Sequence, residues 1–230
     1  MGWPGEEITS LAKPVLGLGF TAGYVDALGF VDLHGVYTAA MTGNTVQFGI
    51  AMARGEWSQF SLIAATLGSF FFGAIVASSV RRRLSRPQLL LIAVMALLST
   101  AQVFRLVNGG PLLFELPLLA MAMAVQGQTI SRFGATAMQT VVMTSNLLKF
   151  ADAIVGRYLD GAARHGPAAA RTPLADVILP GCGWLSYAVG AASGVIAAHA
   201  LALPFLPPII ILAVVCGDLL RIERAAPPHG

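Results

Sequence analysis

One polar motif occurs twice in this chain, first as Met41-Thr42-Gly43-Asn44-Thr45-Val46-Gln47-Phe48 and, 102 residues later, as Met143-Thr144-Ser145-Asn146-Leu147-Leu148-Lys149-Phe150. Both copies open with Met-Thr, carry asparagine at the fourth position and end on phenylalanine at the eighth. We call residues 41–44 the first quartet and residues 143–146 the second quartet. A polar motif repeated inside an apolar chain is typical of an internally duplicated membrane protein. Such proteins usually place a binding site or pathway between their two halves.

The composition predicts a lipid environment. Of the 230 residues, 56% are hydrophobic and only 11% are charged, and the mean hydropathy is +0.75. A chain with so few polar side chains cannot cover a water-soluble globule. The net charge of +3 comes without a stripe of lysine and arginine, so nucleic acid is excluded as a partner.

Six apolar runs are each about long enough, at ~1.5 Å per residue, to cross a hydrocarbon core of ~30 Å. They are residues 13–31, 62–80, 88–106, 111–130, 178–203 and 206–220. Two further segments, 35–53 and 134–157, are neither clearly membrane nor clearly loop. The chain has six spans if these segments are broken or re-entrant, and eight if they cross.

The basic residues favour six spans. In the six-span arrangement twelve of the fourteen lysines and arginines fall on one side, and only Arg54 and Arg105 fall on the other. With eight spans, the arginines at 81–83 would face the side opposite Arg157. The positive-inside rule therefore predicts a multi-pass membrane protein of six spans with both termini in the cytoplasm.

Three spans per copy would make the duplication inverted, because an odd number of crossings turns the second copy upside down. We expect an all-α membrane protein whose first repeat is 1–110 and whose second repeat is 111–230. The span after each quartet carries small residues at every fourth position, which let helix backbones approach closely in lipid. They are Ser69, Gly73 and Ala77 in the first repeat and Ser186, Gly190, Gly194 and Ala198 in the second.

The quartets predict helix starts at membrane depth. Gly43 permits unusual backbone angles, and Thr42 or Asn44 could cap the amides of the helix that follows; Thr144, Ser145 and Asn146 offer the same in the second copy. The start of a half-helix presents amide donors and a partial positive charge to an anion or polar solute. The alternative is that both quartets are ordinary capped loops at the membrane interface, left over from duplication.

Asp26 lies about halfway along the first span, and the 102-residue offset pairs it with Gln128. An ionisable side chain at this depth is costly and points to function, as a proton carrier or cation ligand. The competing interpretation is structural, with Asp26 accepting hydrogen bonds from a helix end or from Asn44. Nearer the membrane surface, Arg105 and Glu115 flank a turn and are expected to form a pair on the outer surface.

The run Ala22-Gly23-Tyr24-Val25-Asp26-Ala27-Leu28-Gly29-Phe30, followed by the first quartet, resembles the YoaK-like family of bacterial multi-pass membrane proteins. The likeness covers nearly the whole chain, and the family has no established substrate. In that family the second half carries a looser matching element, here Gln126-Gly127-Gln128 and the second quartet. This chain departs from the family pattern at Ser145, where a glycine would match Gly43 of the first quartet, and at Gln128, where a smaller amide is usual.

Transport is the function that these patterns favour. A channel or carrier for a small polar or ionic solute would use Asp26 with both quartets and Gln128, and would need the lipid bilayer and no cofactor or metal. A homo-oligomer is compatible with the sequence. The alternative is a non-transport membrane component, such as an assembly partner or sensor, whose polar residues bind its own helices together. The sequence shows no hydrolase, phosphate-binding or metal-ligand motif, so we expect no enzyme.

Overall fold

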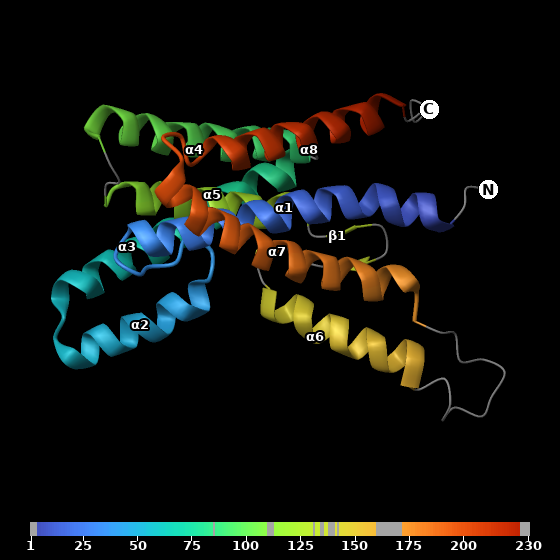
Figure 1. Ribbon diagram of the computed structural model, residues 1–230, viewed down its shortest axis with the longest axis horizontal. Helices are drawn as coiled ribbons and strands as arrows, with labels where there is room; N and C mark the ends of the chain where they lie inside the picture. Colours follow the sequence, from blue (N-terminus) through green and yellow to red (C-terminus); the bar gives the residue numbers. More distant parts are fainter. Residues whose placement is uncertain are drawn as a thin grey trace.

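The computed structural model describes residues 4–84, 86–109, 113–130, 132–133, 136–137, 141, 143–159 and 172–225. Helices make up the architecture of this part of the chain, as the composition predicts (Figure 1). The exception is a two-residue antiparallel pair, in which β1 (Arg132–Phe133) aligns Arg132 with Ala137 of β2 (Thr136–Ala137).

In each half of the chain the second helix is the shortest of its four α-helices, and two long helices follow it. The first half contains a long helix, a short one and two more long ones: α1 (Pro4–Asp32), α2 (Met41–Arg54), α3 (Trp57–Arg83) and α4 (Pro87–Asn108). The second half contains α5 (Glu115–Thr129), α6 (Met143–Ile154) continued by the π-helix η1 (Val155–Leu159), α7 (Leu174–Ala200) and α8 (Leu206–Ala225). Gly55 and Gly109 end α2 and α4 with φ near +70°, a conformation that glycine adopts without strain.

Each of the six predicted apolar runs overlaps a helix. Within the described residues, four helices are long and apolar enough to cross a membrane: α1 over Leu11–Asp32, α3, α4 and α7. Helix α5 has only 15 residues, which is ~22 Å of helix, and the start of the predicted run at 111–112 lies outside the described residues. Bulky side chains such as Phe71, at 68% exposure, and Ile196, at 67%, cover the outside of these helices. Such a surface suits lipid contact.

The most extensive packing joins α1 to α7, and the next joins α3 to α5. Small residues make both contacts possible. A Cβ added at Gly190 of α7 would lie 2.1 Å from the carbonyl oxygen of Phe20, and one added at Gly73 of α3 would lie 3.2 Å from that of Met121. The close approach expected from the small-residue pattern is therefore present in both halves.

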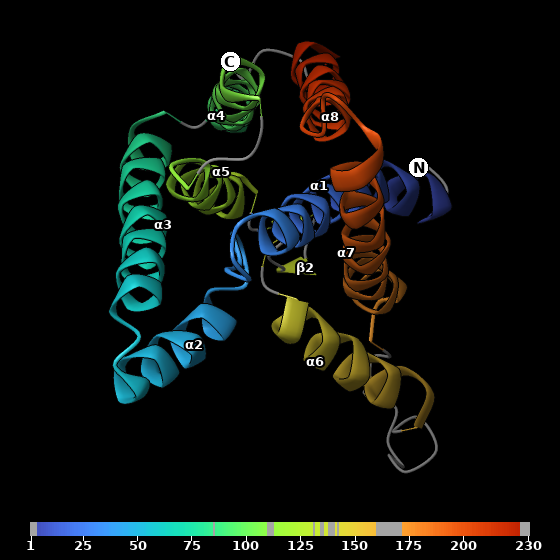
Figure 2. The same cartoon turned by 60° about the vertical axis from the view of Figure 1, so that its left-hand side comes forward.

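The two short helices α2 and α6 differ from the rest in position. Helix α2 packs on α3, and α6 packs on α7. Figures 1 and 2 show that α2 and α6 begin beside one another near the middle of the molecule and run toward opposite ends. Helices α1 and α5 also run in opposite directions, and α1 begins at the end of the molecule where α8 finishes (Figure 1).

Candidate functional site

The segment between α1 and α2 turns back toward the middle of the molecule, and Asp26 holds it there. The Oδ1 atom of Asp26 accepts hydrogen bonds from the backbone N–H groups of Thr38 at 2.7 Å, Ala39 at 2.6 Å and Ala40 at 3.3 Å. Asp26 is only 2% exposed. One buried carboxyl oxygen thus satisfies the amides of the loop that leads into α2.

The second oxygen of Asp26 joins the two repeats expected from the sequence. Its Oδ2 atom accepts a hydrogen bond from the hydroxyl of Tyr187, which belongs to α7. All these neighbours donate to Asp26, so the carboxyl serves as an acceptor for a loop and for a second helix. This geometry matches the structural alternative given for Asp26, and its use as a proton or cation site stays a prediction.

Asn44 of the first quartet also holds the loop before α2. Its Oδ1 accepts from the backbone N–H of Tyr37 at 2.9 Å, and its Nδ2 donates to the carbonyl oxygen of Tyr37 at 2.7 Å. The ring of Tyr37 stacks on Phe30, with centroids 4.5 Å apart, and covers Gly43, where an added Cβ would lie 3.0 Å from the ring. Glycine therefore gives the ring room to lie against α2.

The expected capping of α2 by its own quartet is wrong. The cap residue is Ala40, and no side chain caps the helix start. Asn44 is occupied with Tyr37, because the loop folds back over it, and the Thr45 hydroxyl donates to the Met41 carbonyl at 2.8 Å. Thr42 remains exposed at the start of the helix.

The second quartet repeats the arrangement of the first. Asn146 is fully buried, as Asn44 is, and its Nδ2 lies 3.9 Å from the sulfur of Met143, where the Asn44 amide lies 3.7 Å from that of Met41. Thr144 is exposed, and Ser145 is half-buried like Gly43. Residues 134–135, 138–140 and 142, which belong to or adjoin the predicted broken segment, lie outside the described residues.

The 102-residue offset makes Gln128 the counterpart of Asp26 in the second half, and its place in a binding site stays a prediction. Gln128 is half-buried on α5, whereas Gln126 is fully buried and donates through its Nε2 to the carbonyl oxygen of Leu18 at 2.8 Å. Gln126 therefore provides the amide that links α5 to α1.

A buried ion cluster joins four helix ends. The Arg105 Nε lies 2.5 Å from Glu115 at the start of α5, and its Nη1 lies 2.6 Å from Asp32 at the end of α1. The guanidinium also lies over the ring of Phe205, next to α8, at 4.7 Å. Arg105 is 8% exposed and Glu115 is 1% exposed. The expected surface pair is thus buried, because α1 and the residue before α8 close over it.

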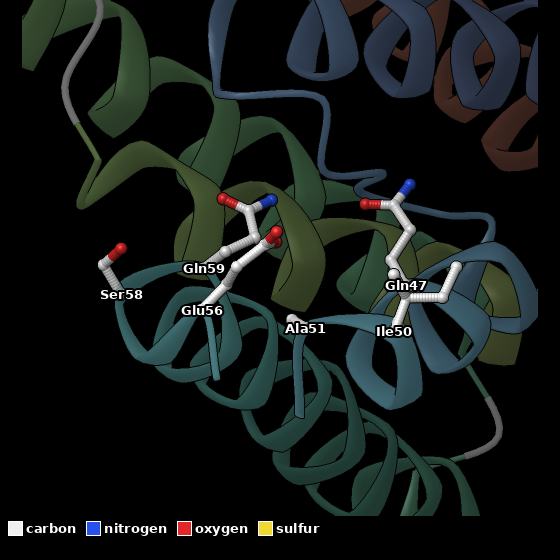
Figure 3. Close-up of a pocket in the computed structure, with 6 residues that line it drawn as sticks. All are labelled: Gln47, Ile50, Ala51, Glu56, Ser58 and Gln59. Atoms are coloured by element: carbon white, nitrogen blue, oxygen red, sulfur yellow. The ribbon is translucent and has the colours of Figure 1, made fainter. Parts of the chain in front are cut away.

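A pocket of about 420 Å³ lies where α2 ends and α3 begins. Figure 3 shows its polar side chains, with Glu56 and Gln59 together on one side and Gln47 on the other. Gln47 lies one helical turn beyond Asn44 on α2. The pocket therefore opens at the end of the molecule toward which α2 runs and does not include the quartet.

Comparison with known proteins places the chain in a family. A family model described as protein of unknown function (DUF1275) matches residues 15–217. The chain belongs to the DUF1275 family. It is 28% identical over 185 residues to the UPF0700 transmembrane protein YoaK of Bacillus subtilis (strain 168), covering 74% of this chain and 76% of that protein. No solved structure matches the chain.

The DUF1275 match agrees with the resemblance to YoaK-like membrane proteins seen in the sequence. It includes both quartets, Asp26 and the Arg105 cluster. Tyr187 and Tyr37 are site residues that sequence reasoning missed. Tyr187 is the residue after Ser186, one of the small residues with which α7 packs against α1. Its place next to that small residue was the only signal in the sequence that could have identified Tyr187.

Proposed function

We propose that this DUF1275 chain is a transporter or channel for a small polar or ionic solute. The observation that supports it is the pair of half-helices α2 and α6, which begin side by side at the middle of the molecule and run apart (Figure 2). Each begins with a quartet of the same burial pattern. Interrupted helices of this kind are tolerated at membrane depth where they are buried in protein or line a water-filled path.

The proposed architecture is six spans in two inverted repeats, 1–110 and 111–230, with α2 and α6 re-entrant. The packing supports it, because α1 contacts α7 as its counterpart α5 contacts α3. Gly190 and Gly73 occupy equivalent positions in these two contacts. The opposite directions of α1 and α5 are those an inverted repeat requires (Figure 1).

The proposed orientation in the bacterial inner membrane puts both termini in the cytoplasm. Helix α3 ends with Arg81, Arg82 and Arg83, and it runs toward the end where α1 begins (Figure 1). Arg54 and Arg105 lie in the last turns of α2 and α4, which run in the direction opposite to α3. This distribution supports the arrangement with most basic residues inside.

In the proposed site, the solute lies between the starts of α2 and α6. Each helix start carries about half a positive charge, and the exposed hydroxyls of Thr42 and Thr144 offer hydrogen bonds to an anion or a polar solute. Asp26 and Asn44 fix the loop before α2, and Asn146 is buried at the matching place in α6. Gly43, Ser145 and Gln128 complete the set predicted from the sequence.

The second candidate is a non-transport membrane component, and one observation favours it. Asn44 and Asn146 are fully buried, and both carboxyl oxygens of Asp26 accept hydrogen bonds, from the loop amides and from Tyr187. In this alternative the polar residues only hold helices together. The exposed residues Thr42 and Thr144 distinguish the two candidates, because hydroxyls that hold helices together would be buried between them.

Stopped-flow light scattering on proteoliposomes tests the proposal. The probes are glycerol, urea, potassium formate and potassium nitrate, each imposed as an osmotic gradient. At least one should enter faster than in empty liposomes. Replacing Thr42 and Thr144 together with valine, which keeps the shape and removes both hydroxyls, should slow that solute about ten-fold, as expected for the loss of one or two hydrogen bonds.

The matched control is Thr100→Val, because Thr100 is also exposed and its hydroxyl bonds only to the Ala96 carbonyl of its own helix. This variant should keep the wild-type rate. Equal rates in empty liposomes and in liposomes with correctly inserted protein, for all four probes, would reject the proposal. An equal loss in the Thr100 control would reject the assigned site.

A further inference from the structure

A groove of about 710 Å³ runs along the outside of the bundle between α1 and α8. Its walls are apolar side chains, among them Leu16 of α1 and Ile210 and Val214 of α8. Its floor is the contact between Gly17 and Val215, where an added Cβ on Gly17 would lie 2.7 Å from a Val215 methyl. A groove that is open to the outside and has such walls fits an extended hydrocarbon chain.

One end of the groove is charged. Lys13 of α1 and Asp218 and Arg221 of α8 line it there, and an Arg221 nitrogen lies 3.7 Å from an Asp218 oxygen. These three side chains together carry one net positive charge. Arg221 is 85% exposed at its side chain, so it can turn toward a phosphate at the membrane surface without losing a buried partner.

The length of the groove matches one leaflet. Eleven residues separate Ile210 from Arg221, which is ~16 Å of helix, and half of a ~30 Å hydrocarbon core is ~15 Å. A second apolar pocket, of about 630 Å³, continues past Ile210 and Ile211 to Leu203. A chain that entered at the charged end would therefore find apolar wall down to the bilayer midplane.

We propose that this groove binds an anionic phospholipid of the bilayer, with one acyl chain between α1 and α8 and its phosphate at Lys13 and Arg221. The charge complementarity selects an anionic head group over a zwitterionic one. Helix α1 begins and helix α8 ends at the same end of the molecule (Figure 1). The proposal depends only on the membrane location of the chain and is independent of transport.

Native mass spectrometry of the full chain in detergent tests this site with two probes of identical acyl chains, phosphatidylglycerol and phosphatidylcholine. The wild type should retain one phosphatidylglycerol at a concentration at least about ten-fold lower than phosphatidylcholine. The double variant Lys13→Ala, Arg221→Ala should lose that preference. Asp218→Asn should strengthen it, because Asp218 is the acidic residue among the described residues that line the groove. Val214→Trp, which fills the groove and keeps its charges, should weaken the binding of both lipids.

The control is Arg83→Ala, which removes an exposed arginine that does not line the groove, and it should bind like the wild type. An unchanged preference in the double variant would overturn the proposal. A loss in Arg83→Ala as large as that in the double variant would also overturn it, since it would mean attraction by overall charge. Circular dichroism of each variant shows whether the helices are retained.

Discussion

The Tyr187 hydroxyl of α7 donates to the Asp26 carboxyl of α1, and the other oxygen of that carboxyl accepts from the loop before α2. One side chain therefore connects the packing of two long helices to the position of a half-helix. The contact lies where Gly23 touches the Tyr187 carbonyl oxygen, with an added Cβ only 2.0 Å from it. A change at Asp26 should affect both the helix pair and the loop.

Asp26→Leu should lower the free energy of unfolding by about 3 kcal/mol or more, because it leaves buried amides and a hydroxyl without an acceptor, at ~1–3 kcal/mol each. Asp26→Asn keeps one acceptor oxygen and should cost less, about 1 kcal/mol. Unfolding of the purified protein by increasing fractions of SDS in mixed micelles measures both. Asp152→Leu, at an exposed carboxyl on α6, is the control and should stay within about 0.5 kcal/mol. A loss in Asp26→Leu no larger than in this control would contradict the assigned contacts.

Gly190→Ala should destabilise the protein by about 1–3 kcal/mol, because its new methyl group meets backbone that cannot rotate away. The oxygen of Phe20 would lie 2.1 Å from that Cβ. Gly68→Ala is the matched control, since nothing lies within 4 Å of its added Cβ, and it should be neutral or slightly stabilising. The same SDS titration compares them. If the two alanines have equal effects, close approach of α1 and α7 does not stabilise the fold.

Much of the architecture could be predicted because lipid imposes simple rules on a sequence. Apolar length located the four helices of the described residues that are long enough to span a membrane, α1, α3, α4 and α7. The quartets located the starts of α2 and α6 at Met41 and Met143. The small-residue pattern identified the helices that approach most closely. Each of these features depends on residues close together in the sequence, which is why a single sequence is enough.

The site geometry could not be predicted because it depends on how loops fold back. His34, with φ of 56°, and Gly35, with φ of 70°, turn the chain so that the amides of residues 38–40 reach Asp26. A single offset also cannot align the two halves. The quartets are 102 residues apart, whereas Gly73 and Gly190 are separated by 117, so the offset of the quartets does not extend to every pair of counterparts.

The burial of Arg105 was missed for a similar reason. The turn after α4 suggested a surface position, but Asp32 and Phe205, which cover the guanidinium, come from distant parts of the chain. Only the packing of α1, α4, α5 and α8 brings these groups together. The sequence shows that residues of opposite charge are present, but it does not show which of them lie next to Arg105.

Arg105→Leu should destabilise the protein by about 3–5 kcal/mol, because it leaves two carboxylates close together without their cation. Arg54→Leu is the control, since its pair with Glu56 is exposed, with a nitrogen–oxygen distance of 3.9 Å, and such pairs contribute ~0–1 kcal/mol. SDS titration at neutral pH measures the difference. Similar losses in both variants would mean that the cluster with Asp32 and Glu115 is solvated in the membrane.

Cysteine labelling tests the re-entrant arrangement of α2 and α6. With Cys182 and Cys216 replaced by alanine, single cysteines are introduced as Arg54→Cys, Arg83→Cys and Tyr158→Cys. A membrane-impermeant maleimide should label Arg54→Cys in intact bacterial cells, and the other two only after the membrane is permeabilised. The reason is that α6 returns to the face it came from, which keeps positions 83 and 158 on one side. If α2 and α6 both crossed, as in the eight-span arrangement, these two positions would face opposite sides, and labelling of Arg83→Cys but not of Arg54→Cys or Tyr158→Cys in intact cells would show it.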